Sequence, residues 1–350
     1  MKIGIITFHC ADNYGAILQT FGLYTKLKEL YPSSEVFLVD YCPVSITKVY
    51  SLIKFKNMSS FITSLVSLPL SIKRKLKFNK FRNSNFNYIY LKNIHCLDYL
   101  ICGSDQIWNP DITKGIDPCY FGQIEGFGGK IIAYAASDGG YFETIDNKIR
   151  GYVEKINAVS VRESAMLPIF SQSNKKIFVV LDPVFLINNN VWKNVSRKKK
   201  CKNYILVYLL ERNEDLLKNV YSFAKQKGLK IIQITMRYPF WKIHKNKHKI
   251  VTTADISDFL SYILHAEYVF TNSFHGTASS IIFNKNFVAF KLKNKRNNRI
   301  HELLSTFDLL DRFRDNFNIE EQNDINYQIV NSLIETKRNE SIFFLEKNIS

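Results

Sequence analysis

Short apolar runs alternate with stretches of helical periodicity along most of this 350-residue chain, and this alternation constrains the fold more than any other feature. Parallel strands that are buried on both faces have continuous apolar sequences, and a helix usually connects one to the next. The pattern therefore predicts an α/β protein with mostly parallel sheets. We expect strands at 3–8, 36–41, 99–102, 130–136, 158–161, 177–181, 204–210, 230–235, 268–272 and 287–292, and helices after residue 13 and near 144–155, 214–227, 255–265, 275–283 and 327–347.

The alternation is interrupted where three asparagines from Asn188 and the basic run Arg197–Lys200 replace periodic apolar residues. A chain of this length is roughly two domains long, so we place a domain boundary there. We predict two Rossmann-like domains facing across a cleft, with ligands beyond the carboxyl ends of the strands. The predicted domains are 1–187 with a basic insertion near 44–95, 188–320, and a helical tail over 321–350.

The chain carries 48 basic and 31 acidic residues, a formal net charge of +17. Only 12 of the basic residues are arginine, which bidentate phosphate recognition favours, and no nucleic-acid-binding module is recognisable. Nucleic acid is therefore not expected as a partner. The charge is concentrated between Asp40 and Asp98, where there is no acidic residue. This basic stretch surrounds the apolar run 61–72, which favours contact of 58–82 with an anionic membrane surface; the alternative is a solvated insertion packed on the first domain.

The six cysteines show no C-x-x-C spacing, as expected for a protein of a reducing compartment. The apolar run after Lys2 is too short for a signal peptide, and no run approaches the length of a transmembrane helix. We therefore expect a cytoplasmic protein, peripheral at the inner face of the cell membrane.

The first candidate loop follows the first predicted strand. Asp12 and Asn13 can cap the next helix, and Gly15 allows a ligand to approach the backbone closely. Backbone N–H groups at a helix N-terminus attract anions. We therefore count Asp12, Asn13, Tyr14 and Gly15 as candidate cleft residues, with an ordinary N-cap turn as the alternative.

The second candidate loop begins where the strand 99–102 ends. Gly103 and Ser104 are followed by the carboxylate of Asp105, the amide of Gln106 and the indole of Trp108. Polar groups beside a flat aromatic face commonly hold sugars. The alternative is a capped turn with Trp108 in the core.

The third candidate loop joins the strand 268–272 to a helix rich in small residues. His275 lies at this junction, with Ser273, Gly276 and Thr277 around it. The positive end of a helix dipole attracts phosphate, and a bound phosphate would favour the imidazolium form of the histidine. The loop therefore predicts an anion site with a general acid.

Two further segments can supply cations. Arg162 ends an apolar strand, where either a bound anion or an ion pair with Glu163 would accommodate its charge. The stretch 291–299 carries five cations and no acid, and Lys295 and Arg299 are its candidates for reaching a ligand.

In their order along the chain, these motifs resemble those of the polysaccharide pyruvyl transferase family. The resemblance implies two Rossmann-like domains in a glycosyltransferase-B-like arrangement. It also implies transfer of a pyruvyl group from phosphoenolpyruvate to two hydroxyls of a sugar in a surface polysaccharide or its lipid-linked precursor, with a ketal and phosphate as products. The segments that carry the resemblance are Asn13–Ala16 with Leu18-Gln19, Gly103–Trp108, Ser160–Glu163, Asp182-Pro183 and Ser273–Gly276, over about residues 3–300.

Phosphoenolpyruvate brings a phosphate and a carboxylate, and its C3 must be protonated to make C2 electrophilic. The resemblance therefore implies that His275 is the acid and that Arg162 binds an anion. It places Ser273, Gly276 and Thr277 around the phosphate, with Lys295 or Arg299 nearby. Phosphoenolpyruvate is then the donor substrate, and no cofactor is expected. The implied acceptor side comprises Asp12, Asn13, Tyr14, Gly15, Gly103, Ser104, Asp105, Gln106 and Trp108.

The nearest alternative is a sugar-nucleotide-dependent glycosyltransferase, because the same fold supports both activities. A basic nucleic-acid-binding protein is a more distant one. His244 and His248 lie four residues apart, but no acidic or cysteine partner accompanies them, so no metal is expected. The acceptor sugar and the oligomeric state stay open.

Overall fold

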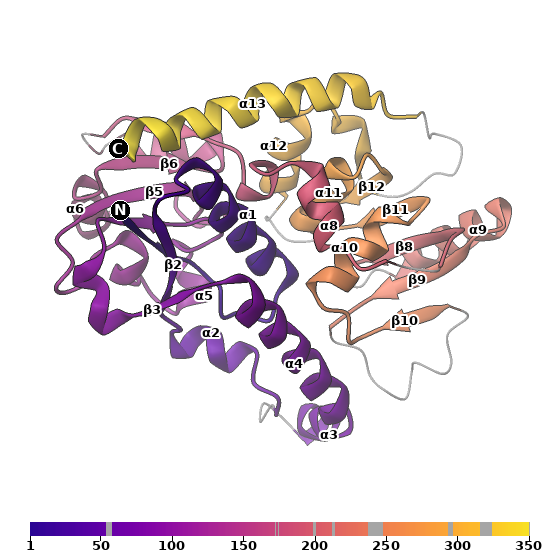
Figure 1. Cartoon of the computed structure of the whole chain (residues 1–350). Coiled ribbons are helices and arrows are strands. Elements are labelled where there is room, and N and C mark those ends of the chain that lie inside the picture. Colours follow the sequence, from indigo (N-terminus) through magenta and orange to yellow (C-terminus); the bar gives the residue numbers. More distant parts are fainter. Residues whose placement is uncertain are drawn as a thin grey trace. The chain divides into compact units, whose positions relative to one another are not determined.

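The computed structural model describes residues 1–53, 58–171, 173, 175–198, 201–211, 214–236, 248–292, 297–315 and 324–349. The chain divides into two compact units, each built on one parallel sheet (Figure 1). Unit 1 comprises Met1–Tyr50, Arg82–Ile187 and Ser332–Ser350, and unit 2 comprises Ser51–Phe81 and Asn188–Asn331.

Unit 1 contains a seven-stranded sheet in the order β3-β2-β1-β4-β5-β6-β7. The chain moves outward from β1 to β2 and β3, then returns to the other side of β1 and continues from β4 to β7. The direction of winding therefore changes between β1 and β4, and the loops after these two strands adjoin at the carboxyl edge. The strands are β1 (Lys2–Ile6), β2 (Glu35–Asp40), β3 (Tyr88–Tyr90), β4 (Tyr99–Cys102), β5 (Lys130–Ala136), β6 (Ala158–Val161) and β7 (Ile177–Val179).

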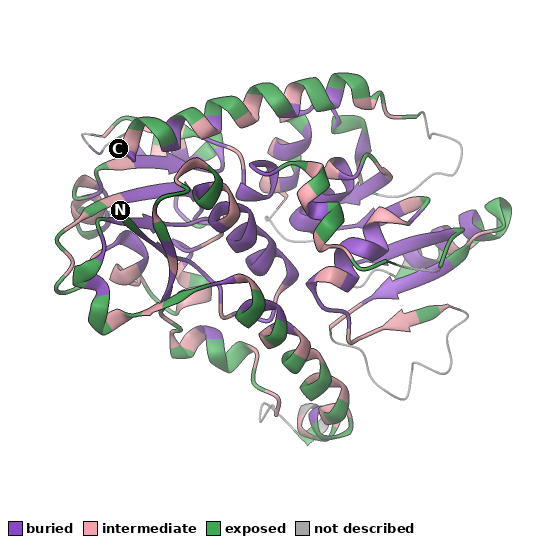
Figure 2. Ribbon diagram, viewed as in Figure 1, coloured by how far each residue is buried: buried purple, intermediate pink, exposed green. Residues whose placement is uncertain are grey.

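Helices and short 3-10 turns connect these strands. The longest helix of unit 1, α1, begins directly after the cap residue Asn13 and buries most of its first three turns. Apolar strand and helix residues pack in a buried cluster that includes Ile6, Leu100, Ala133 and Val153, and Figure 2 shows the central strands as buried. The helical segments are α1 (Tyr14–Leu30), α2 (Val44–Val49), η1 (Leu91–Cys96), α5 (Pro110–Thr113), η2 (Pro118–Phe121), α6 (Asn147–Glu154), η3 (Ser164–Met166), α7 (Leu167–Phe170) and η4 (Pro183–Phe185).

Unit 2 repeats this topology with a six-stranded sheet in the order β10-β9-β8-β11-β12-β13. Its winding changes direction between β8 and β11, so the loops after those strands adjoin at the carboxyl edge. The strands are β8 (Tyr204–Tyr208), β9 (Lys230–Ile234), β10 (Lys249–Val251), β11 (Tyr268–Thr271), β12 (Asn286–Phe290) and β13 (Phe313–Arg314).

Two helices pass from one unit into the other along the chain: α4 (Leu68–Asn85) and α13 (Tyr327–Asn348). The first begins in unit 2 and ends in unit 1, and so does the second. The remaining helices of unit 2 are α3 (Met58–Val66), α8 (Asn189–Val195), α9 (Glu214–Lys227), α10 (Ile256–Leu264), α11 (Phe274–Ile282), α12 (Asn298–Thr306) and the short η6 (Leu310–Arg312).

The prediction of two parallel-sheet, Rossmann-like domains is confirmed. The unit boundary between Ile187 and Asn188 lies where the sequence placed a domain boundary. Two segments group differently from the predicted division: 51–81 belongs to unit 2, and the end of the tail belongs to unit 1. The sequence also missed β3, β10 and β13, because two or three residues are too few to show a strand pattern.

Candidate active site

The loop after β1 is held by an arginine from far along the chain. The Nε of Arg82, in the last turn of α4, donates to the carbonyl oxygen of His9 at 3.0 Å. Its Nη2 donates to the carbonyl oxygens of Cys10 at 3.2 Å and Ala11 at 2.8 Å. The same nitrogen pairs with the carboxylate of Asp12 at 2.7 Å, and both side chains are buried. The charge of Asp12, a predicted cleft residue, is thus neutralised within the protein.

The N-terminus of α1 is closed by its own cap residue. The Oδ1 of Asn13 accepts hydrogen bonds from the backbone N–H of Gly15 at 2.8 Å and of Ala16 at 3.3 Å. Tyr14 is only 1% exposed. The geometry therefore matches the N-cap turn that the sequence offered as the alternative to an anion site.

Behind this turn, the buried side chains of Gln19 and Thr7 join the loops that follow β1 and β4 through the backbone of Ser104. Gln19 donates from Nε2 to the Thr7 hydroxyl at 2.8 Å, and that hydroxyl donates to the carbonyl oxygen of Ser104 at 2.9 Å. The backbone N–H of Ser104 donates to Oε1 of Gln19 at 3.1 Å and completes the ring. Gly103 stands just before it at φ 131°, where a Cβ would lie 2.1 Å from the carbonyl oxygen of Tyr134. Only glycine fits at this strand end.

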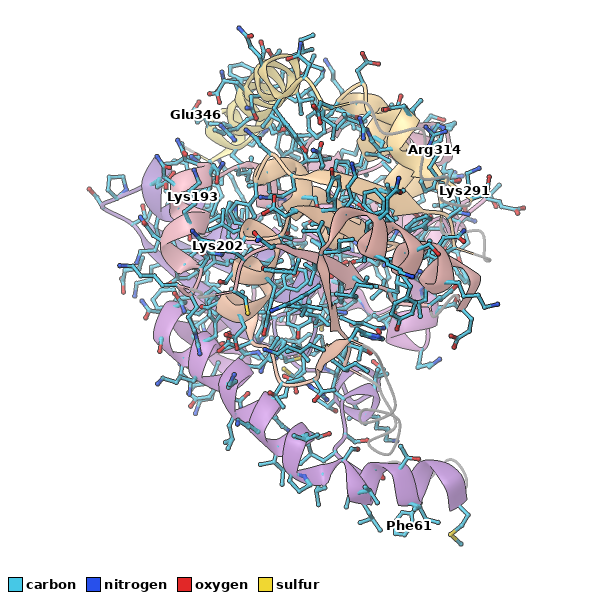
Figure 3. All side chains as sticks on the ribbon, turned by 90° about the vertical axis from the view of Figure 1, so that its right-hand side faces the viewer. Phe61, Lys193, Lys202, Lys291, Arg314 and Glu346 are labelled. Atoms are coloured by element: carbon cyan, nitrogen blue, oxygen red, sulfur yellow. The ribbon has the colours of Figure 1, made fainter. Side chains whose placement is uncertain are left out.

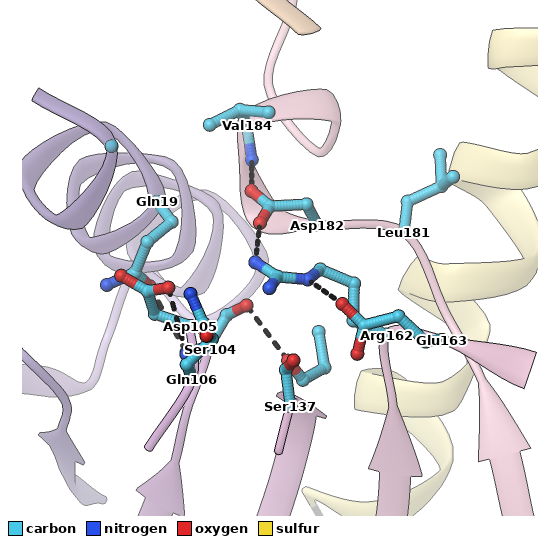
Figure 4. Close-up of polar contacts among 12 residues, drawn as sticks. Gln19, Ser104, Asp105, Gln106, Ser137, Arg162, Glu163, Leu181, Asp182 and Val184 are labelled. Atoms are coloured by element: carbon cyan, nitrogen blue, oxygen red, sulfur yellow. Dashed lines mark hydrogen bonds and ion pairs between the residues drawn. The ribbon is translucent and has the colours of Figure 1, made fainter. Parts of the chain in front are cut away.

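Arg162, at the end of β6, lies between two buried carboxylates (Figure 4). Its Nε donates to Oε1 of Glu163 and its Nη1 to Oδ2 of Asp182, each at 2.8 Å. Burial disfavours the charged guanidinium, but these carboxylates and that of Asp105 outweigh burial, so the pKa of Arg162 is raised above its usual value. The ion pair that the sequence offered as an alternative is therefore formed, with Asp182 as a second partner.

Trp108 requires a correction, because its indole is 1% exposed. The ring stacks on Phe121 with centroids 4.9 Å apart, and its Nε1 donates to the carbonyl oxygen of Tyr120 at 3.0 Å. It therefore belongs to the core and offers no face to a sugar. Gln106 is half-buried instead, and its Oε1 accepts from Nδ2 of Asn109 at 3.0 Å.

The loop after β5 is a further polar loop that was not among the three candidate loops. Ser137 and Asp138 are fully buried there, and the Asp138 carboxylate accepts from the backbone N–H groups of Gly140 and Phe142. The backbone N–H of Ser137 donates to the carbonyl oxygen of Asp105. A signal was present, since a small polar residue, a carboxylate and two glycines follow a predicted strand directly.

In unit 2, the loop after β11 is organised by hydroxyl groups. The hydroxyl of Thr271 donates to the carbonyl oxygen of Tyr208 at 2.7 Å and accepts from the backbone N–H of Ser273 at 3.1 Å. Ser273 caps α11 by accepting from the N–H of Gly276 at 3.4 Å, and Thr277 returns a hydrogen bond to the Ser273 carbonyl oxygen at 3.0 Å. The strand end and the first turn of the helix are thus one hydrogen-bonded unit.

Gly276 is required by the close approach of α11 to the sheet. A Cβ at this position would lie 2.4 Å from Oγ1 of Thr271 and 3.1 Å from the ring of Tyr208. The absence of a side chain lets the first turn rest directly on the ends of β8 and β11, which places residue 275 at their carboxyl edge.

His275 lies in the first turn of α11 and is 8% exposed. Its ring meets that of Phe274 edge to face, with centroids 5.1 Å apart. The structure therefore brings His275 together with Ser273, Gly276 and Thr277, as predicted from the sequence.

The predicted cations of unit 2 divide into three cases. Arg299 lies in the first turn of α12, which packs against α11. Lys295 lies outside the described residues. Lys291 forms an ion pair with Asp315 at 2.6 Å, so its charge is engaged at the surface.

Asn272, which no prediction included, links this loop to the one after β8. Its Oδ1 accepts from the backbone N–H of Leu210 at 2.6 Å, and its Nδ2 donates to the carbonyl oxygen of Glu211 at 2.9 Å. These two hydrogen bonds fix the loops after β8 and β11 to each other, and so they anchor the loop that carries His275.

The comparisons with known proteins agree on the family and the fold. The family model described as polysaccharide pyruvyl transferase matches residues 13–294. No curated protein matches the sequence closely enough to count as a relative. Among solved structures, UGT89C1 of Arabidopsis thaliana, complexed with UDP-L-rhamnose, is similar at 9% identity with a TM-score of 0.53, over 99% of this chain and 97% of that one. UDP-GlcNAc 2-epimerase of Neisseria meningitidis, bound to UDP-GlcNAc, is similar at 11% identity with a TM-score of 0.50, over 99% and 100%. At such identities these likenesses show the fold alone.

Proposed function

The chain belongs to the polysaccharide pyruvyl transferase family, and on that premise we propose that it transfers the pyruvyl group of phosphoenolpyruvate to two hydroxyls of one sugar, forming a ketal and releasing phosphate. The observation that carries this proposal is the loop after β11. It combines an N-terminal helix turn, hydroxyl side chains and a histidine at the carboxyl edge of a parallel sheet.

This loop suits a phosphate ester for electrostatic reasons. The buried polar side chains from Thr271 to Thr277 are hydroxyls, the amide of Asn272 and the imidazole of His275, so an anion entering there meets no carboxylate among them. The positive end of the α11 dipole points the same way. We assign Ser273, Gly276 and Thr277 to the phosphate, with a cation from Lys295 or Arg299.

The chemistry assigns one proton transfer to His275. The imidazolium donates a proton to C3 of phosphoenolpyruvate, which leaves C2 electrophilic. A first sugar hydroxyl forms a C–O bond at C2 and loses its proton to solvent, from which the imidazole of His275 is protonated again. A second hydroxyl forms the other C–O bond as the bond from C2 to the phosphate oxygen breaks, and its proton leaves with phosphate or to solvent.

We assign the acceptor to the carboxyl edge of unit 1, where Gln106 and the backbone around Ser104 and Asp105 supply polar groups. A sugar is uncharged and bonds well to carboxylates and amides. Arg162 stays in the proposal as an anion binder, but its two ion pairs give it a second role, that of holding Asp182 and Glu163 in place.

The rival activity is glycosyl transfer from a sugar nucleotide. Two of the similar structures were determined with uridine diphosphate sugars bound. Nucleotide-sugar binding is a property of those proteins. A nucleotide is therefore the ligand to compare with phosphoenolpyruvate in binding experiments.

The proposal is tested with purified protein, phosphoenolpyruvate and lipid-linked saccharides as acceptors. We expect phosphate release that requires the acceptor, and a pyruvate ketal on the product by NMR. Phosphoenolpyruvate at 100 times its Kd should stabilise the fold by about 2.7 kcal/mol. Stabilisation by UDP with none from phosphoenolpyruvate, and no ketal, would overturn the proposal in favour of the rival.

We further propose that α3 and α4 hold this cytoplasmic enzyme at the inner face of the membrane, beside a lipid-linked acceptor. Figure 3 shows both helices with Phe61 of α3 labelled. Ile62, Leu65 and Val66 of α3 are exposed at helical spacing. Among the described residues, no helix has both the length and the apolar character to cross a bilayer.

Some cations of α4 form contacts within unit 2, and others are exposed. Arg74 donates to carbonyl oxygens of Met236 and Thr252, and Lys77 pairs with Asp258, so these two are engaged within unit 2. Three others, at 73, 75 and 80, are exposed. Each exposed lysine near an anionic surface is worth about 1 kcal/mol.

Point variants test this surface better than a deletion, because removing 58–82 would also remove Arg82 and free the loop after β1. The triple variant Lys73→Gln, Lys75→Gln, Lys80→Gln should lose most of its sedimentation with phosphatidylserine vesicles. A matched loss of three charges elsewhere, Lys193→Gln with Lys198→Gln and Lys202→Gln, should change little. Equal sedimentation of both variants would overturn the membrane role.

A further inference from the structure

The carboxyl ends of β1 and β2 bring together four side chains that bind transition metals. His9 and Cys10 follow β1, Asp40 ends β2, and Cys42 lies two residues further. β1 and β2 pair in parallel, so both strands end at the same edge of the sheet. The sheet therefore assembles the group, although the sequence spacing resembles no metal motif.

The potential ligand atoms are already close. One atom each from His9, Asp40 and Cys42 lie within 4.8 Å of one another, with Nε2 of His9 3.9 Å from Sγ of Cys42. Cys10 directly follows His9 in the chain, after the same strand. Around a tetrahedral Zn²⁺ ion, ligand atoms stand about 3.3–3.8 Å apart, because the bonds are about 2.0–2.3 Å long. The ligand atoms would therefore move closer together when an ion binds.

The tautomer of His9 suits a metal ligand. Its Nδ1 lies 3.2 Å from the carbonyl oxygen of Thr7, which can only accept a hydrogen bond. Nδ1 therefore carries the proton, and the lone pair of Nε2 faces Cys42. Metal-binding histidines usually hold their other N–H on a carbonyl or carboxylate in this way. His9 is 2% exposed, and its ring rests 5.7 Å from that of Tyr88, so its direction is settled before any ion arrives.

We propose that Nε2 of His9, Sγ of Cys10, Sγ of Cys42 and the carboxylate of Asp40 bind one Zn²⁺ ion. Two thiolates with an imidazole select a soft divalent ion over Mg²⁺ or Ca²⁺. Asp40 and Cys42 are exposed, which gives the ion a path from solvent. Each thiol releases its proton to solvent as its S–Zn bond forms.

The guanidinium of Arg82 fits this assignment. Besides its ion pair with Asp12, Arg82 donates to the carbonyl oxygen of Cys10 at 3.2 Å, so it helps to fix the backbone that carries two of the ligands. Four protein ligands close the shell, as in structural zinc sites, so the ion would fasten the loop after β1 to the end of β2. It takes no part in the proposed transfer.

The test uses the reduced, metal-free full chain without donor or acceptor, so it does not depend on the proposed function. Titration with Co²⁺ should give one equivalent bound, with thiolate-to-cobalt charge-transfer absorption, and Zn²⁺ should displace it. The exposed ligands are the safest to change: Cys42→Ser and Asp40→Asn should each weaken Zn²⁺ binding by about 10-fold or more. Cys96→Ser, an exposed cysteine of the same unit outside the group, should bind like the wild type.

Three outcomes would overturn the site. Co²⁺ could bind without thiolate absorption, Cys42→Ser could bind Zn²⁺ as tightly as the wild type, or the reduced protein could take up no ion. If the native protein has lost two thiols to a Cys10–Cys42 disulfide and still takes up no Zn²⁺ after reduction, the pair is a redox pair and the zinc site is refuted.

Discussion

Units 1 and 2 wind their sheets in the same way around a switch point, yet they surround it with different chemistry. At the carboxyl edge of unit 1, buried charged groups are already paired, as in Asp12 with Arg82 and Arg162 with Glu163 and Asp182. At the end of β11 in unit 2, the buried polar groups are hydroxyls, the amide of Asn272 and the imidazole of His275. An anionic ligand can enter the second environment without displacing an ion pair. The same topology thus supports buried ion pairs in unit 1 and, at the end of β11 in unit 2, a loop without a buried ion pair.

If this contrast is correct, the largest effect on chemistry comes from unit 2. His275→Gln should lower acceptor-dependent phosphate release about 10²–10⁴-fold, because one general acid is lost. Thermal unfolding should change little. His301→Gln, which alters an exposed histidine of α12, should keep the wild-type rate. A near-normal rate for His275→Gln would remove the acid role.

The largest effect on stability should come from unit 1. Arg162→Leu leaves two buried carboxylates without their partner and should cost about 3–5 kcal/mol in the free energy of unfolding, measured in urea. The control is Arg197→Leu, since Arg197 also bridges two carboxylates but its side chain is 52% exposed. That change should cost at most about 1 kcal/mol. Equal costs for the two variants would contradict the distinction between them.

The loop after β11 and the first turn of α11 should be sensitive to a methyl group added at Gly276. Gly276→Ala places a Cβ 2.4 Å from Oγ1 of Thr271, and the resulting strain should cost about 1–3 kcal/mol and weaken phosphoenolpyruvate binding. Gly151→Ala, also within a helix, meets nothing within 4 Å and should gain up to about 1 kcal/mol from helix propensity. The two thermal shifts should therefore have opposite signs.

The smallest expected effect distinguishes Asn13, the N-cap of α1, from Ser273, the N-cap of α11. Asn13→Ala should destabilise unit 1 by about 1 kcal/mol without changing the KM for phosphoenolpyruvate, because Asn13 serves its own helix. Asn13→Asp keeps the cap and should be near neutral. Ser273→Ala should raise that KM. A raised KM for Asn13→Ala would restore the first loop as an anion site.

Much of the fold could be predicted from the sequence because periodicity records burial. The bounds of β4, β5, β6 and α9 agree with the expected ones. The loop around His275 was found because small polar residues directly follow an apolar strand. In such places the information lies within a few neighbouring residues.

The rest depended on partners that are distant in sequence. Arg82 and the carbonyl oxygen of His9 are 73 residues apart, and nothing in the basic run around Arg82 indicates that it reaches the loop after β1. Arg162 and Asp182 are 20 residues apart. The residue type of Trp108 suits a core and a sugar platform equally, and only packing decides between them. The ligands of the proposed zinc site were overlooked for the same reason, because two strands assemble them.

The end of α13 has a consequence for how the protein is made. Tyr31 donates to the carbonyl oxygens of Leu345 and Ile349, and the hydroxyl of Ser341 accepts from the backbone N–H of Leu181. The ribosome adds Ser341, Leu345 and Ile349 only after all the strands of unit 2 have been synthesised. The strands of unit 1 are therefore synthesised first, but unit 1 can be completed only when the end of α13 has been made. Unit 2 can begin to fold as soon as its own strands have been synthesised.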